Sequence, residues 1–265
     1  MKQFTVFSNR NAYSQKIKNE LTRKLESRGY IVTSNFSPKS DLNLSIGGDG
    51  AFIKAVHQSG FSKIPFVGIN TGHLGFFQEI DAGDLDAFLD AYEEETYATE
   101  EILLIEARIK TRKNEFRFFA LNEFLFKNMW SRMIQFSVTV DGVDMERFAG
   151  DGMLLSTPAG SSGHNASLLG AIMHPSVRAF EMTPIAPLHS TQYRSLRNSL
   201  IVPDGSVVNL APDARYLNTC ILVADGIEKR IREIQSIDFY ISKRSIRRLS
   251  FSENWYWHNL RDKFL

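Results

Sequence analysis

The stretch LNLSIGGDGAFIKAV, residues 42–56, decides the fold of this chain. An apolar strand candidate precedes its glycines, and residues with a helical pattern follow them. Glycines at a strand end let the backbone turn sharply or approach another molecule closely. One glycine would serve a turn, so three of them around a carboxylate indicate a loop that gathers bare amides. These residues are Gly47, Gly48, Asp49 and Gly50.

Strands alternate with helices over the first hundred residues. An apolar residue recurs at every fourth position from Tyr13 to Leu25, which predicts an amphipathic helix that ends near Gly29. Strands that alternate with helices imply a parallel sheet, and ligands bind at the carboxyl ends of its strands. The strand candidates are residues 4–7, 30–33, 42–46 and 65–69.

The pattern changes to a period of two near residue 100, which predicts strands with one buried face. Residues 134–140 alternate in this way, and Asp141-Gly142 is a hairpin turn signal. A helix is expected over residues 161–173. The sequence therefore predicts an α/β domain over residues 1–100 and a mostly antiparallel β domain over residues 101–239.

Composition excludes several classes of protein. The 43% hydrophobic and 23% charged fractions are those of a globular chain rather than a disordered one. A formal net charge of +1 provides no field to recruit nucleic acid or an anionic membrane. A single cysteine, Cys220, excludes an intrachain disulfide. No apolar run suits a signal peptide or a membrane span, so we expect a cytoplasmic protein. The basic run at residues 243–248 is expected to be a solvated strand edge or turn, and an anion-binding rim is the alternative.

Residues alone leave the role of the IGGDG turn open. Neither GxxxxGK[ST] nor a GxGxxG after a strand occurs, so a P-loop NTPase and the simplest dinucleotide-binding site are excluded. The loop amides could bind an anion while Asp49 acts on a hydroxyl or holds Mg²⁺. Alternatively, Asp49 simply N-caps the following helix.

Three further motifs follow the first. GINTGHLGFF, residues 68–77, ends the next strand, and its His73 is expected to be a structural hydrogen-bonding residue. LNEF, residues 121–124, places an amide and a carboxylate inside an apolar strand. Residues 150–175 repeat Gly-Asp-Gly and continue into serines and threonines. Such side chains suit ribose hydroxyls, base edges and phosphates.

GGDG, TGHLGF, LNE and the segment from residue 150, in this order, closely resemble the NAD kinase family over nearly the whole chain. The resemblance implies a Rossmann-like first domain of the phosphofructokinase and diacylglycerol kinase type, to which the tail from about residue 240 to 265 returns. It implies a β-sandwich second domain that binds NAD and mediates oligomerisation. The implied activity is Mg²⁺-dependent phosphoryl transfer from ATP or polyphosphate to the adenosine-ribose 2′-hydroxyl of NAD, giving NADP. The implied assembly is a homotetramer or homodimer without nucleic-acid or membrane partners.

The resemblance also assigns roles to residues. Asp49 matches the catalytic aspartate, and the glycines at 47, 48 and 50 match the phosphate loop. No protein metal ligand is implied, because ATP phosphates are expected to hold Mg²⁺. The positions that match NAD-binding residues are Phe76, Asn122, Glu123, Asp151, Ser162, His164, Ser167 and Asp225.

Three positions depart from the family pattern. Ala51 stands where the family has threonine, His164 where it has tyrosine, and Ala149 where members of similar length have arginine. These changes are expected to alter ligand affinity or regulation without abolishing the chemistry. They also motivate one alternative, a catalytically weak or inactive NAD(P)-binding regulatory paralogue. A second alternative is a lipid or sugar kinase that shares the GGDG loop.

Overall fold

The computed structural model divides into two compact units, and each is described by itself. Unit 1 comprises Met1–Ile102 and Ser245–Leu265, and unit 2 comprises Leu103–Arg244. The chain passes from one unit to the other within two long strands, β6 (Ala98–Thr111) and β17 (Ile234–Ser250). The structure describes residues 1–72, 75–189 and 194–265.

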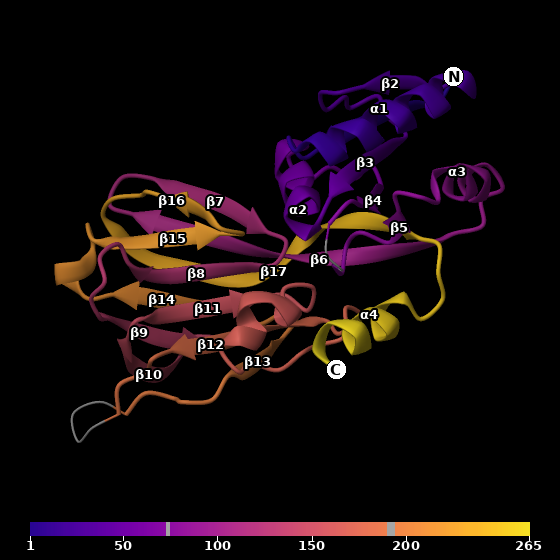
Figure 1. Cartoon of the computed structure of the whole chain (residues 1–265). Coiled ribbons are helices and arrows are strands. Elements are labelled where there is room, and N and C mark those ends of the chain that lie inside the picture. The colour runs from indigo at the N-terminus through magenta and orange to yellow at the C-terminus, as the bar shows by residue number, and fades with distance from the viewer. Residues whose placement is uncertain (73–74, 190–193) are drawn as a thin grey trace. The chain divides into compact units, whose positions relative to one another are not determined.

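Unit 1 is built on a parallel sheet. Its strands run in the order β17-β4-β3-β1-β2, and β5 pairs with β4 (Figure 1). The strand bounds are Gln3–Ser8 for β1, Ile31–Thr33 for β2, Leu42–Gly47 for β3, Phe66–Asn70 for β4 and Ile80–Asp81 for β5. The helices are α1 (Ala12–Ser27), α2 (Asp49–Gln58), α3 (Leu85–Glu93) and α4 (Trp255–Phe264).

Helices α1, α2 and α3 of unit 1 are held by buried apolar side chains, and the apolar stripe of α1 is the one that the sequence predicts. Ile17 and Leu21 of α1 share a buried cluster with Leu89 of α3 and the sheet residues. Helix α2 packs differently, because its Phe52 stacks on Phe77 with ring centroids 4.8 Å apart. The loop between β3 and α2 is therefore flanked by a strand and a helix that are both held by packing.

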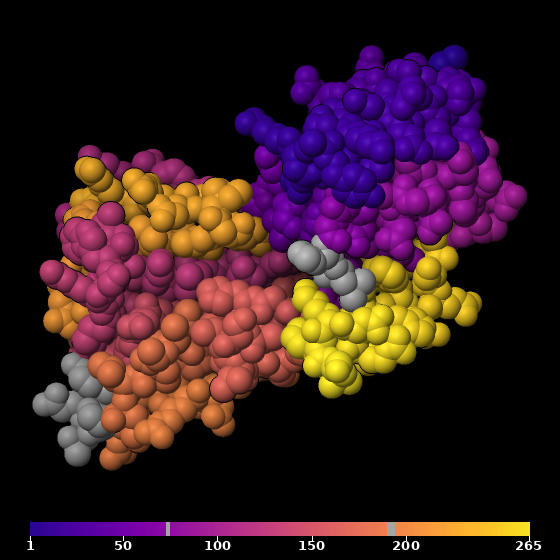
Figure 2. All heavy atoms as spheres, viewed as in Figure 1, coloured from indigo at the N-terminus to yellow at the C-terminus, as the bar shows by residue number. Residues whose placement is uncertain are grey.

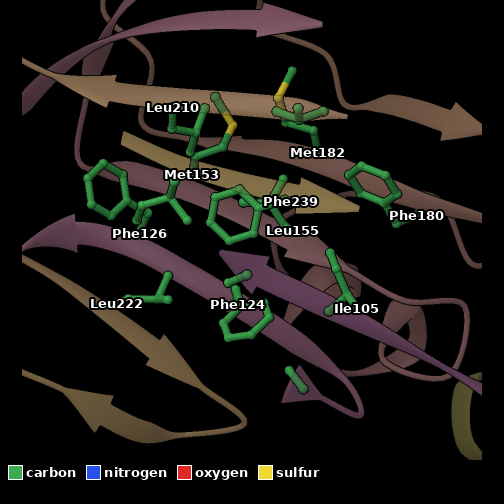
Figure 3. Close-up of a cluster of buried hydrophobic side chains, with 14 of the residues drawn as sticks. Ile105, Phe124, Phe126, Met153, Leu155, Phe180, Met182, Leu210, Leu222 and Phe239 are labelled. Atoms are coloured by element: carbon green, nitrogen blue, oxygen red, sulfur yellow. The ribbon is translucent and has the colours of Figure 1, made fainter. Parts of the chain in front are cut away.

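Unit 2 consists of antiparallel sheets. One has the order β13-β12-β11-β8-β15-β16, and the other contains β10-β9-β14-β17 together with β6 and β7. Phe124, Phe126 and Phe239 lie in the core, which Figure 3 shows. The further strands are β7 (Glu115–Ala120), β8 (Glu123–Asn128), β9 (Ile134–Val140), β10 (Val143–Gly150), β11 (Gly152–Ser156), β12 (Ala179–Ile185), β13 (Leu200–Pro203), β14 (Val208–Pro212), β15 (Cys220–Ala224) and β16 (Ile227–Lys229).

Three local segments were predicted from the sequence: a hairpin turn at 141–142, a helix over 161–173 and a solvated basic run at 243–248. The hairpin turn is confirmed, because Asp141 and Gly142 both have positive φ, 52° and 78°, as a type I′ turn requires. The helix expected over residues 161–173 forms only in part. A π-helical turn at Ser161–Asn165 continues for two α-helical residues, 166 and 167, and Gly163 inside the turn leaves helical geometry at φ −98° and ψ −123°. The basic run is not wholly solvated either, since Arg248 is buried.

Across the described parts of the chain, every helix is too short or too polar to cross a bilayer.

Removing buried volume from α1 is expected to destabilise the protein. Leu21 is fully buried, so Leu21→Ala should lower the free energy of unfolding by about 3 kcal/mol, through lost burial and the cavity left behind. Urea denaturation measures this change. Leu169→Ala makes the same chemical change at a side chain that is 94% exposed and should have almost no effect. Equal effects at both positions would contradict the packing described for α1.

Candidate active site

Asp49 lies at the junction of β3 and α2. It is the first residue of the helix, and the N-cap position belongs to Gly48, which has no side-chain capping bond. The interpretation of Asp49 as a simple N-cap is therefore wrong. The side chain is free of that role because the loop ends one residue earlier than the capping hypothesis requires.

The Asp49 carboxylate is held by the backbone of the second glycine-rich loop. The Phe76 amide donates to Oδ2 and the Phe77 amide to Oδ1, each over 2.9 Å. A Cβ at position 75 would overlap the carboxylate, so only glycine allows this approach. The second motif thus fixes both oxygens of the half-buried carboxylate. His73, also in that motif, lies outside the described residues.

The three glycines of the first loop have different surroundings. A Cβ at Gly47 would overlap the Ala51 side chain and the Asn9 amide, so packing requires glycine there. At Gly48 and Gly50 a Cβ would meet no atom within 4 Å, so these two residues border open space. The loop is therefore packed on one side and accessible on the other.

Sequence reasoning missed one residue that shapes this loop. Gln78 is buried, and its Nε2 donates to the Gly48 carbonyl over 2.8 Å. Its place directly after the GINTGHLGFF motif was the only signal available, because a lone glutamine has no distinctive pattern. Together, Gln78 and the two phenylalanine amides connect both glycine-rich loops.

In unit 2 the carboxylate of Asp225 orders the LNE segment. Oδ2 accepts from the Leu121 amide over 2.8 Å, and Oδ1 accepts from the amides of Asn122 over 2.8 Å and Glu123 over 3.1 Å. Asp225 itself has a positive φ of 46° in the turn between β15 and β16. Three backbone bonds to one carboxylate fix the conformation of the residues that precede β8.

This anchored segment carries two buried acceptors. Oδ1 of Asn122 and Oε2 of Glu123 are buried and have no hydrogen-bond partner among the described residues. Burial, together with the nearby charge of Asp225, raises the pKa of Glu123 to about 7. Unpartnered buried polar atoms are costly, so a pair of them side by side indicates a site for a ligand with donor groups. The sequence suggested that Glu123 lies inside a strand, whereas it is the first residue of β8.

The segment after β11 is joined to Asn122. The Thr157 amide donates to the Asn122 carbonyl over 2.8 Å, and Gly160 packs so closely on Asn122 that a Cβ would overlap its backbone. The turn Ser161–Asn165 follows at once. It contains the buried Ser162 and the exposed His164, and the exposed Ser167 comes just after it.

Asp151 lies apart from these residues. It is exposed and precedes β11, whose first residue, Gly152, pairs with Lys127, whereas its last, Ser156, pairs with Glu123. The length of the strand therefore separates Asp151 from the LNE segment. The structure brings together Asn122, Glu123, Asp225 and the turn at 161–165 in unit 2, and Asp49, the glycines and Phe76 in unit 1.

The residues that depart from the family pattern differ in exposure. Ala51 and Ala149 are both buried, and Ala149 donates its amide to Ser195 Oγ over 3.2 Å. His164 is exposed, so its ring is accessible. Two of the three departures, Ala51 and Ala149, therefore lie in the packed interior, and the third, His164, lies on the surface.

Comparison with known proteins gives the fold and the family. A solved yeast NADH kinase complexed with NADH has a TM-score of 0.87 at 19% identity, covering 99% of this chain and 87% of that one. An NAD kinase from Archaeoglobus fulgidus in complex with ATP has a TM-score of 0.74 at 23% identity, covering 100% of this chain and 97% of that one. The fold is that of kinases of nicotinamide dinucleotides, and the predicted fold class is confirmed.

Sequence comparison identifies the family. The ATP-NAD kinase N-terminal domain matches residues 7–97, and the ATP-NAD kinase C-terminal domain matches residues 121–249. An NAD kinase of Finegoldia magna is 42% identical over 246 residues, which cover 91% of this chain and 90% of the relative. The chain belongs to the NAD kinase family, as the order of its motifs predicts.

The raised pKa of Glu123 predicts a pH dependence of stability. Folding raises the pKa of this carboxyl group from 4.5 to about 7. The free energy of unfolding is therefore unaffected by this group below pH 4.5 and falls as pH rises from 4.5 toward 7, because only the unfolded state then releases the proton. Glu123→Gln should therefore gain stability relative to wild type across this window, by up to about 3 kcal/mol. Urea denaturation from pH 4 to 8 measures the difference. Glu228→Gln, at an exposed glutamate of β16, should show no such window, and parallel curves for Glu123→Gln would contradict the assignment.

Proposed function

We propose that this member of the NAD kinase family phosphorylates the adenosine-ribose 2′-hydroxyl of NAD, with Asp49 as the catalytic residue. The observation that carries the proposal is the Asp49 carboxylate, held by two backbone amides beside glycines that border open space. Family membership favours this activity over a lipid or sugar kinase.

Asp49 has the capacity to accept a proton from a hydroxyl. Each carboxylate oxygen has two acceptor positions, and each uses one for a backbone amide. The remaining position can accept the substrate hydroxyl and orient its oxygen for attack on the transferred phosphoryl group. The two amides also keep the carboxylate in one orientation, and positioning is the main requirement of phosphoryl transfer.

The glycines at 47, 48 and 50 form the phosphate loop of this proposal. Residues 48 and 50 border open space, so a phosphate can approach the backbone closely there. The N-terminus of α2 adds the partial positive charge of a helix. Among the described residues no group of three His, Cys, Asp or Glu side chains could hold a metal. Mg²⁺ is proposed to arrive with ATP, held mainly by its phosphates, and the ion would neutralise phosphate charge.

The unpartnered acceptors of unit 2 are proposed to bind NAD. Oδ1 of Asn122 and Oε2 of Glu123 can accept hydrogen bonds from the adenine amino group and ribose hydroxyls. We also assign NAD contacts to three residues in and just after the turn at 161–165, which follows the segment bonded to Asn122: Ser162, His164 and Ser167. Phe76 and Asp151 are proposed as further NAD contacts, Phe76 through its half-buried ring.

Donor, assembly and location are proposed on the same basis. The phosphoryl donor is ATP or polyphosphate, and the protein is a cytoplasmic homotetramer or homodimer. One feature of unit 2 supports oligomerisation: Val143 and Met145, on β10, are 62% and 52% exposed. Apolar side chains that stand out together on a strand commonly mark an interface.

Removing the charge of Asp49 is expected to stop catalysis. Asp49→Asn keeps the size of the side chain but lowers its capacity to take a proton, so kcat for NADP formation from NAD and Mg·ATP should fall by about 10³-fold or more. A coupled NADP assay with isothermal titration of NAD separates turnover from binding.

Asp84→Asn is the matched control, because Asp84 also adjoins a helix start without a side-chain capping bond. It should retain wild-type activity. A wild type that binds NAD yet forms no NADP from ATP or polyphosphate would support the regulatory paralogue instead.

The exposed His164 is expected to contribute a ring to NAD binding. Tyrosine offers a larger ring, so His164→Tyr should tighten NAD binding by about 3- to 10-fold if the side chain stacks on the base. Isothermal titration measures the dissociation constant, and His189→Tyr, at another exposed histidine, is the control. Unchanged or weaker binding in His164→Tyr would argue against stacking.

A further inference from the structure

The two peptide groups that hold Asp49 are themselves held from behind by the C-terminal segment. The peptide group between Gly75 and Phe76 donates its N–H to Asp49, and its carbonyl oxygen accepts from Nδ2 of Asn259 over 2.5 Å. The peptide group between Phe76 and Phe77 also donates to Asp49, and its oxygen accepts from Nη1 of Arg248 over 2.6 Å. Each peptide group therefore links a tail side chain to one carboxylate oxygen.

Both tail residues are buried in unit 1. Asn259, on α4, is 2% exposed, and Arg248, on β17, is 6% exposed. Glu100 balances the Arg248 charge, since its Oε2 accepts from Nε over 3.1 Å and from Nη2 over 2.6 Å. In Figure 2 the yellow residues of α4 lie against the purple residues of the same unit.

A second carboxylate fixes the connection between β17 and α4. Oε1 of Glu79 accepts from the Phe251 amide over 2.8 Å and from the Ser252 amide over 2.6 Å. Glu79 lies only two residues after Phe77, so the tail is tied to the same stretch of chain at three points. This arrangement leaves the Gly75–Phe77 backbone little freedom to rotate.

A hydrogen bond to the oxygen of a peptide group strengthens the bond that its N–H donates. The peptide dipoles align along the chain of bonds, and each bond polarises the next. Donation from a guanidinium is stronger than donation from a neutral group. The tail side chains therefore both orient the Phe76 and Phe77 amides and strengthen their bonds to Asp49.

We propose that Asn259 and Arg248 are positioning residues for phosphoryl transfer, acting on Asp49 through these two peptide groups. The inference rests on the proposed role of Asp49. The C-terminal segment then serves catalysis without touching a substrate, and its loss acts on turnover more than on substrate binding.

The test combines kinetics with a spectroscopic measurement on the full-length protein. Asn259→Leu and Arg248→Met each remove one donor at similar side-chain size, whereas Arg248→Lys keeps a donor within reach of the Phe76 carbonyl. Arg247→Met is the matched control, because Arg247 also donates to a backbone carbonyl from β17, that of Lys63. kcat and KM are measured for NAD and Mg·ATP, and the amide proton shifts of Phe76 and Phe77 by NMR.

Loss of either donor should lower kcat by about 10-fold while both KM values stay within about 2-fold. The Phe76 amide proton should move upfield in Asn259→Leu and the Phe77 amide proton in Arg248→Met, with partial recovery of kcat in Arg248→Lys. Arg247→Met should match wild type in every measurement.

Amide shifts that stay at wild-type values in both folded variants would overturn the proposal, as would a rise in KM with unchanged kcat. A wild type without kinase activity would refute the proposed function instead, and the amide shifts would still decide whether the tail acts on the bonds to Asp49. If Arg248→Met does not fold, Asn259→Leu and Arg248→Lys carry the same comparison.

Discussion

The pair of hydrogen bonds from the Phe76 and Phe77 amides to Asp49 is the constraint on which the organisation of unit 1 depends. These bonds require β3 and β4 to end level, which the pairing of Gly47 with Asn70 ensures. They also require a glycine at 75, because any side chain would occupy the space of the carboxylate. Strand register, loop composition and carboxylate orientation are therefore consequences of one local arrangement.

Unit 2 uses an aspartate in a related way but for a different purpose. Asp225 accepts three amides from the residues before β8, which leaves its carboxylate committed to the backbone. These bonds fix the backbone of Asn122 and Glu123, whose side chains each keep one buried acceptor oxygen without a hydrogen-bond partner among the described residues. In unit 1 the held carboxylate is the proposed reactive group, whereas in unit 2 the holding carboxylate prepares a binding group.

Sequence reasoning predicted those parts of the structure that depend on local patterns. The stripe through Ile17 and Leu21, the type I′ turn at Asp141 and the glycine loop before α2 each follow from a period or a turn preference. What it could not predict depends on partners distant in the chain. Nothing near Asn259 or Gln78 in the sequence indicates which carbonyl each would meet. The helix expected over residues 161–173 extends only to residue 167, and the close approach of Gly160 to the Asn122 backbone is likewise a distant contact that no local pattern indicates.

The three departures from the family pattern lie outside the hydrogen bonds that hold Asp49. Ala51 is packed against Gly47, and Ala149 is buried with its amide bonded to Ser195. Neither residue contributes a bond to the groups that hold Asp49. His164 is exposed and also lies outside those bonds. Substitutions of this kind change what a ligand can contact while leaving the carboxylate in place, so they adjust affinity before they affect the chemical step.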